Sequence, residues 1–189
     1  MISFEGFGVG LVVLVVLIAS FGYALVATIL ASFGRAVPWG PPWSTSLVPV
    51  LCLLGLGIAG YLTFVETRQV VAICGPVGDC NTVQSSPYAK LFGFLPVGLL
   101  GLIGYLAILA AWAIGRFSKG RLSDLAAVAM FAFAFFGVLF SIYLTYLELA
   151  IIRAICIWCL TSAVIMAVLL LLTTRSALVR LVFEDASAS

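Results

Sequence analysis

Five uninterrupted apolar stretches of roughly 20 residues each limit what this chain can fold into. About 20 apolar residues cross the hydrocarbon core of a bilayer, and a backbone in lipid must satisfy its own hydrogen bonds, so each stretch is expected to be a helix. The whole chain is 65% hydrophobic and 8% charged, whereas soluble domains carry about 25% charged residues. A water-soluble globular protein is therefore excluded. The predicted spans are Phe7–Leu30, Leu47–Val65, Leu95–Ile114, Leu125–Leu147 and Ala154–Leu172.

The spans predict an all-α integral membrane protein with a four-helix transmembrane core and one extra N-terminal helix. The first span is expected to be retained rather than cleaved as a signal peptide, because Glu5 and no Lys or Arg precedes a long apolar run. We expect residues 1–46 to form this helix and a cytoplasmic loop, residues 47–174 the core, and residues 175–189 a short cytoplasmic tail. The segments between the spans leave no room for a second, soluble domain.

Positive charges predict how the chain is oriented, because cytoplasmic loops carry an excess of Lys and Arg. If the spans alternate in direction, six basic residues lie on one side of the membrane and three on the other. The richer side holds Arg35, Arg116, Lys119, Arg121, Arg175 and Arg180, and the poorer side holds Arg68, Lys90 and Arg153. The loop 66–94 and the turn 148–153 are then extracytoplasmic. We expect a multi-pass protein of the plasma (inner) membrane.

An internal repeat divides the predicted core into two hairpins. The sequence YLTFVE at Tyr61–Glu66 recurs as YLTYLE at Tyr143–Glu148, and a cysteine follows each glutamate by eight residues, at Cys74 and Cys156. Both copies end a helix that runs outward in the predicted orientation. Repeated hairpins of this kind commonly frame a binding site at their interface.

The two repeated glutamates lie at helix C-termini, where a negative charge opposes the helix dipole. Arg68 and Arg153 are close enough in sequence to pair with Glu66 and Glu148. Two interpretations stay open: simple placement of charge at the membrane interface, and a role in handling protons.

Four cysteines form two pairs on the predicted outer side. Cys156 and Cys159 form a C-x-x-C motif at the start of the last span, where a helix N-terminus stabilises the reactive thiolate. Cys74 and Cys80 bracket a glycine-rich loop, followed by a segment suited to a short surface helix ended by Pro87. A loop disulfide above a fixed C-x-x-C pair would form a relay for thiol–disulfide exchange.

The cysteines also admit metal-binding, packing, transport and structural interpretations. Zinc or iron–sulfur binding fits poorly with the unequal C-x5-C and C-x2-C spacings, so we expect no metal site. Cys52 lies in the middle of a span and is interpreted as ordinary packing. A transmembrane thiol-electron transporter would need cysteines reachable from both faces, and a structural membrane protein would hold static disulfides. Nothing indicates a nucleic-acid partner.

The two cysteine pairs and the run DCNTVQSSPYAKLFGFLPVG after the loop resemble the vitamin K epoxide reductase family, in particular its bacterial members. The resemblance covers roughly residues 47–172. It implies a four-helix bundle that moves electrons from an extracytoplasmic thioredoxin-fold protein to a membrane quinone, menaquinone or ubiquinone. The partner would be a separate DsbA-like protein, and the outcome would be disulfide bond formation.

The resemblance also implies roles for individual residues. Cys74 and Cys80 would be the shuttle pair, and Cys156 and Cys159 the active-site pair beside the quinone. Epoxide-reducing animal members carry an asparagine and a tyrosine where this chain has Phe94 and Ala163, which favours reduction of quinones over epoxides. The residues expected to line the quinone pocket are Ser86, Phe94, Trp158 and Ala163.

Overall fold

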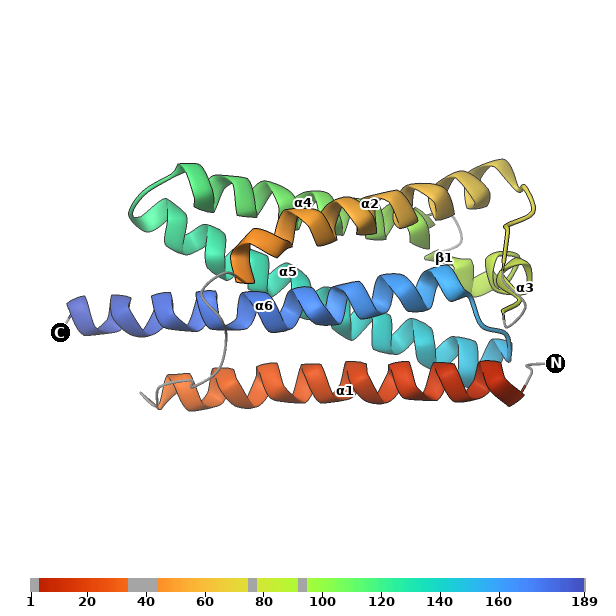
Figure 1. Ribbon diagram of the computed structural model, residues 1–189, viewed down its shortest axis with the longest axis horizontal. Helices are drawn as coiled ribbons and strands as arrows, with labels where there is room; N and C mark the ends of the chain where they lie inside the picture. The colour runs from red at the N-terminus through yellow and green to blue at the C-terminus, as the bar shows by residue number, and fades with distance from the viewer. Residues whose placement is uncertain (1–3, 34–43, 75–77, 92–94, 189) are drawn as a thin grey trace.

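A computed structural model describes residues 4–33, 44–74, 78–91 and 95–188 of the chain. Five of its helices are long and apolar enough to cross a membrane, and they lie side by side along one axis (Figure 1). This confirms the predicted all-α membrane architecture. The elements in chain order are α1 Phe4–Ser32, α2 Ser44–Arg68, α3 Cys80–Gln84, a 3₁₀ turn Pro87–Ala89, β1 Lys90–Leu91, β2 Leu95–Pro96, α4 Val97–Phe117, α5 Arg121–Tyr146, the π-helical segment η2 Leu147–Ile152 and α6 Ile157–Ala188.

Helices α2 and α4 form one hairpin and α5 and α6 the other, as the repeat predicts. The two hairpins share a core that includes fully buried Tyr105 and Ile108 of α4 and Leu169 of α6. The hydroxyl of Tyr105 is 3.0 Å from the carbonyl oxygen of Ser162, to which it donates, so α4 and α6 are also joined by a hydrogen bond.

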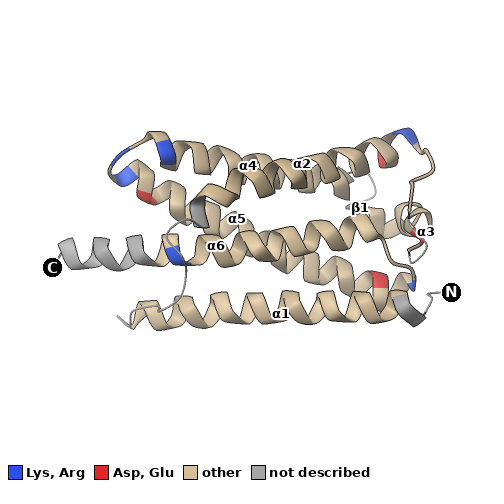
Figure 2. Ribbon diagram, in the orientation of Figure 1, with Lys and Arg blue, Asp and Glu red and all other residues tan. Residues whose placement is uncertain are grey.

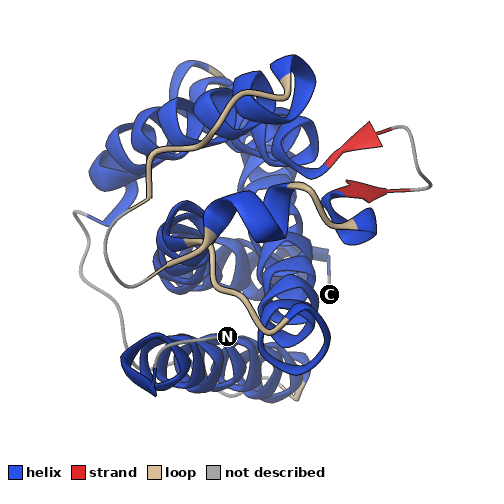
Figure 3. Cartoon of the chain, turned by 90° about the vertical axis from the view of Figure 1, so that its right-hand side faces the viewer, coloured by secondary structure: helices blue, strands red, loops and turns tan. Residues whose placement is uncertain are grey.

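The extra helix α1 covers one side of the bundle. It packs against α5 and α6 and contacts η2, and in the end-on view it lies apart from the upper helices (Figure 3). Leu17 and Ala24 of α1 are fully buried in the shared core, whereas Val12 and Val15 are 65% and 62% exposed. One face of α1 therefore belongs to the protein core and the opposite face is suited to lipid.

The two ends of the bundle differ in composition. The end that holds the α4–α5 turn carries the basic residues of that turn and of α6 together with Asp124 of α5 (Figure 2). The opposite end holds α3, β1 and the glutamates, together with Arg68 and Arg153. Both cysteine pairs lie at this second end.

The predicted spans differ from the helices by a few residues at most ends. The largest difference is in α6, which begins at Ile157 rather than Ala154 and continues through the predicted tail to Ala188.

Gly98 allows the closest approach within the first hairpin. A Cβ atom at this position would lie 2.7 Å from the backbone nitrogen of Thr63 in α2, so any side chain must push α2 and α4 apart. We expect Gly98→Ala to lower the free energy of unfolding by roughly 1–3 kcal/mol. Thermal unfolding in detergent measures this. The control is Gly57→Ala, because a Cβ at Gly57 meets nothing within 4 Å; equal melting temperatures for the two variants would contradict the close contact.

Candidate active site

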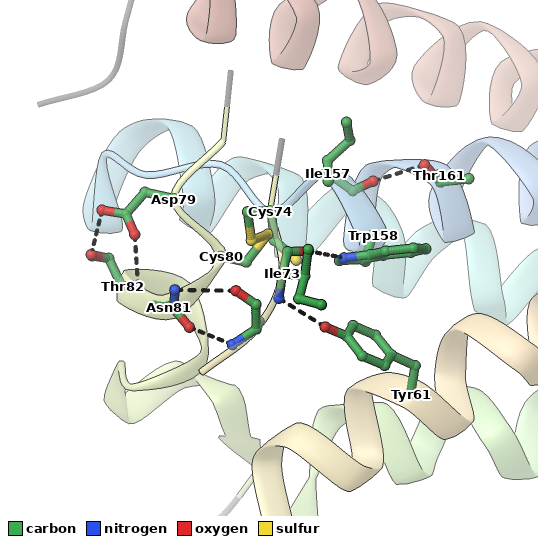
Figure 4. Close-up of a disulfide and its surroundings, with 12 residues drawn as sticks. Tyr61, Ile73, Cys74, Asp79, Cys80, Asn81, Thr82, Ile157, Trp158 and Thr161 are labelled. Atoms are coloured by element: carbon green, nitrogen blue, oxygen red, sulfur yellow. Dashed lines mark hydrogen bonds between the residues drawn. A yellow bond between two sulfur atoms is a disulfide. The ribbon is translucent and has the colours of Figure 1, made fainter. Parts of the chain in front are cut away.

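A disulfide joins Cys74 and Cys80 (Figure 4). It lies beside α3, at the end of the bundle opposite the α4–α5 turn (Figure 1). The two Cα atoms are 6.0 Å apart. Cys80 is fully buried at the start of α3, whereas Cys74 is only half-buried. A molecule that approaches from outside therefore reaches Cys74 before Cys80.

The backbone just before Cys74 is anchored from both hairpins. The N–H of Ile73 donates to the hydroxyl of Tyr61 at 2.8 Å, and the indole N–H of Trp158 donates to the carbonyl of Ile73 at 2.9 Å (Figure 4). The Tyr61 and Trp158 rings lie 5.1 Å apart. The sequence predicted a flexible loop here; the structure fixes the chain up to Cys74, and residues 75–77 lie outside the described part.

The other side of the disulfide loop rests on the segment before α6. The N–H of Asp79 donates to the carbonyl of Ile155 at 2.9 Å, and a Cβ at Gly78 would lie 2.9 Å from the same oxygen. Asp79 also caps α3 by accepting from the Thr82 hydroxyl and N–H, and these bonds lower the pKa of its carboxyl. The loop is thereby held directly above Cys156.

Cys156 and Cys159 are free thiols at the start of α6. Cys156 directly precedes the helix and is fully buried in a cluster with Cys80, rather than open to the outer surface. The Cys159 thiol and the N–H groups of Cys159 and Trp158 hydrogen-bond to the Cys156 sulfur and lower the pKa of Cys156, although burial opposes them. Cys156 is therefore the thiol prepared to act as a thiolate beneath the loop disulfide.

The lowered pKa of Cys156 predicts a pH-dependent difference in reactivity. Its largest cause is the hydrogen bond from Cys159, so Cys159→Ala should raise the pKa of Cys156. The thiolate then forms at higher pH, and the curve of modification rate against pH moves upward. The measurement is modification of the reduced protein by a small neutral thiol reagent, read at Cys156 by peptide mass spectrometry. Superimposable curves for wild type and variant would contradict it.

Glu66 and Glu148, the last residues of the sequence repeat, occupy equivalent positions in the two hairpins. A carboxylate oxygen of Glu66 accepts from the N–H of Gly98 near the start of α4 at 3.0 Å. A carboxylate oxygen of Glu148 accepts from the N–H of Cys156 before α6 at 3.1 Å. Each glutamate thus lies near the end of the first helix of its hairpin. Its carboxylate accepts a hydrogen bond from a backbone N–H at the start of the second helix, where such groups have no partner within the helix.

The expected pairing of these glutamates with arginines is wrong for the described part of the chain. Neither Arg68 nor Arg153 forms an ion pair with them there, and the cation whose charge acts on Glu66 is Lys90. Arg153 instead adopts a left-handed conformation, with φ of 54°, at the end of η2. This π-helical segment turns Glu148 inward, so that the residue is only 3% exposed.

An apolar cavity of about 340 Å³ lies below the Cys156–Cys159 pair, mainly between α4, α5 and α6. Its polar boundary is formed by the Cys159 thiol, both glutamates and a few hydroxyl groups. Phe136 and Ile103 line the cavity and are also 67% and 53% exposed on the outside of the bundle. The cavity therefore borders the lipid-facing surface. Further residues that line it are Gly98, Gly101, Gly104, Phe133, Gly137, Phe140, Ser162 and Met166.

The residues predicted to line a quinone pocket do not all meet at this cavity. Ala163 lines it, and Ser86 lines a smaller adjoining void with Cys159. Trp158 is not among the lining residues, because its indole is turned toward Ile73. Phe94 lies outside the described residues. Cys52 is fully buried in the core, consistent with packing.

Most of the cavity wall was not predicted. The residues predicted for the pocket lie near the cysteines in the sequence, whereas much of the wall comes from α4 and α5. Gly98, Gly101 and Gly104 line the cavity from one face of α4, and this i, i+3 spacing is the signal that could have indicated it. A Cβ at Gly98 or Gly101 would meet α2, whereas a Cβ at Gly104 meets nothing within 4 Å. Among the described residues, no group of three or more Cys, Asp and Glu side chains could hold a metal ion.

A comparison with known families agrees with this geometry. The sequence profile of the vitamin K epoxide reductase family matches residues 46–174, more than half of the chain. The match begins near the start of α2, includes both hairpins and all four paired cysteines, and leaves α1 outside.

Proposed function

The chain belongs to the vitamin K epoxide reductase family, and from this premise we propose that it oxidises an extracytoplasmic thioredoxin-fold protein and delivers the electrons to a membrane quinone. Family membership and five membrane-crossing helices make it a multi-pass membrane thiol oxidoreductase. The observation that supports electron transfer from a partner to a quinone is the order of the four cysteines from the outer surface to the cavity. Half-exposed Cys74 is followed inward by buried Cys80, buried Cys156, and Cys159 at the cavity.

This order supports a relay of thiol–disulfide exchanges. A thiolate of the partner attacks the sulfur of Cys74, and the bond to Cys80 breaks; the partner's second thiolate then releases Cys74 and leaves as a disulfide. Cys80 attacks the oxidised Cys156–Cys159 pair at Cys156, which frees Cys159. Return of Cys74 to Cys80 closes the loop disulfide and leaves Cys156 and Cys159 as thiols. The structure contains this last set of bonds.

The cavity fits a quinone. Its wall is formed by aromatic and aliphatic side chains with few polar groups, and it borders the lipid-facing surface through Phe136 and Ile103. A bound quinone supplies an acceptor for two electrons and two protons. Cys159 would face it, and Ala163, Gly104 and Phe136 would hold it among apolar walls.

The charge distribution supports an extracytoplasmic position for the cysteines. The basic α4–α5 turn lies at the opposite end of the bundle (Figure 2), and the basic end is expected in the cytoplasm. A membrane-impermeant thiol reagent should then label Cys74 or Cys80 in intact, reduced cells. If these cysteines are labelled only after the membranes are permeabilised, they lie on the cytoplasmic side and the proposed orientation is wrong.

Exchange with a partner dithiol tests the relay against a static disulfide. The purified oxidised protein is mixed with an equimolar reduced thioredoxin-fold protein, and the redox state of both is read after acid quenching. We expect the partner to become oxidised by wild type and by the packing control Cys52→Ala, and to stay reduced with Cys74→Ser. A partner that stays reduced with wild type would favour a structural disulfide.

Clustering of both pairs at one end of the bundle argues against a transmembrane thiol-electron transporter. Such a protein must present cysteines to both faces in turn. Here the only other described cysteine, Cys52, is fully buried in the core.

A further inference from the structure

We propose that Glu148 and Glu66 form a carboxyl pair that takes up the protons of the Cys156–Cys159 dithiol when it is oxidised and passes them toward the cavity. The inference rests on the proposed thiol oxidase function and adds the route of the protons. Dithiol oxidation forms one S–S bond, breaks two S–H bonds and releases two electrons and two protons. The quinone accepts both electrons and both protons, so the protein must guide protons as well as electrons to the cavity.

Both carboxyl groups lie where such a route must begin. Glu148 and Glu66 are 3% and 4% exposed, and both line the cavity together with Cys159. The Cys159 thiol lies within hydrogen-bonding reach of both the Glu148 carboxylate and the Cys156 sulfur, and its one proton can be donated to either. A proton that leaves Cys159 therefore has an acceptor already in contact with it. The Cys156 sulfur is hydrogen-bonded to Cys159, so the proton that Cys156 loses on becoming a thiolate can leave along the same path.

A small void connects the two glutamates. Its volume is about 30 Å³, and Glu66, Glu148, Cys159 and Gln84 all line it. The Oε1 atom of Gln84 is buried and has no hydrogen-bond partner among the described residues. A void of this size with several polar atoms has room for one water molecule. Such a water could bridge the two carboxyl groups and satisfy Gln84.

Two hydroxyl groups, those of Ser86 and Tyr88, also line the small void, but neither residue lines the cavity. The chain contains no histidine, which is the side chain most often used for this task. The charged and titratable groups that act on the pair are Cys156 and Cys159 on the α6 side and Lys90 on β1. Among the described residues, Glu66 and Glu148 are the only carboxylates that line the cavity.

A purely structural role is the alternative, because each glutamate accepts a backbone N–H. Glutamine keeps a carbonyl oxygen that can accept the same bond, but it cannot take up a proton. Glu148→Gln and Glu66→Gln therefore separate the two roles while they preserve the hydrogen bonds to Cys156 and Gly98.

The test is infrared difference spectroscopy between the disulfide and dithiol states, prepared with a small phosphine reductant and without quinone. We expect wild type to show a C=O stretching band of a protonated carboxyl group that changes with the redox state and shifts in D₂O. The band should disappear in Glu148→Gln and weaken in Glu66→Gln. A wild-type spectrum without the band, or the same band in both variants, would overturn the proposal.

A second readout is the rate at which pre-reduced protein reduces a short-chain quinone as a function of pH. We expect Glu148→Gln to slow this step on the order of 10²-fold, the usual contribution of a general acid or base, and to flatten the pH profile. Wild-type rates and profiles in both variants would overturn the inference alone. Failure of wild type to reduce any quinone would overturn the proposed function, and the infrared result would still decide the role of the glutamates.

Discussion

Cys159→Ala is expected to lower quinone reduction to less than about one thousandth of the wild-type rate, because it removes the thiol that lies at the cavity and acts in the last covalent step. The measurement is the loss of quinone absorbance with an excess of reduced partner. Cys52→Ala is the matched control, since it removes a buried cysteine of the core. Activity above a few per cent in Cys159→Ala would mean that electrons leave by another route.

The same variant should also accumulate a bridge between Cys80 and Cys156. These residues are fully buried in one cluster, so the Cys156 thiolate can attack Cys80 and release Cys74. Without Cys159, only the return of Cys74 can break the new bond. Non-reducing peptide mapping by mass spectrometry should detect it. A bridge between Cys74 and Cys156 would contradict the proposed order.

Gly104→Phe is expected to raise the KM for quinone by at least about tenfold, which corresponds to about 1.4 kcal/mol of binding free energy. Gly104 lines the cavity, and a Cβ at this position meets nothing within 4 Å. The new ring can therefore enter the cavity without displacing the backbone. It should leave exchange between the partner and the Cys74–Cys80 disulfide unchanged.

Gly57→Phe is the control for this substitution. Gly57 is exposed on α2, has the same free space around it and does not line the cavity. Steady-state kinetics over a range of quinone concentrations compares the two variants. Equal KM values would place the quinone outside the cavity.

The sequence predicted the membrane class, the two hairpins and the positions of the cysteine pairs, because these follow from apolar length and local spacing. It did not predict how the disulfide loop is anchored. The hydrogen bonds of Ile73 with Tyr61 and Trp158 join segments 12 and 85 residues apart, and no local pattern specifies such contacts. The indole that was expected in a quinone pocket is used to hold this loop.

The contacts of the two glutamates are a second feature that the local sequence did not predict. The sequence repeat indicated that Glu66 and Glu148 occupy equivalent positions, but it predicted ion pairs with the nearby Arg68 and Arg153. The structure gives the glutamates backbone N–H groups at the start of the second helix of each hairpin, at Gly98 and Cys156. The π-helical turn at Leu147–Ile152 makes the second contact possible, and sequence periodicity does not reveal such a turn.

Electrons from a partner dithiol are proposed to reach a quinone through this chain. The most direct measurement is the stoichiometry of an anaerobic reaction that contains purified protein in lipid, a reduced thioredoxin-fold protein and a quinone. We predict one quinone reduced for each disulfide formed in the partner, and no quinone reduction with Cys74→Ser or Cys159→Ala. Partner oxidation without quinone reduction, or quinone reduction that persists in both cysteine variants, would contradict the account.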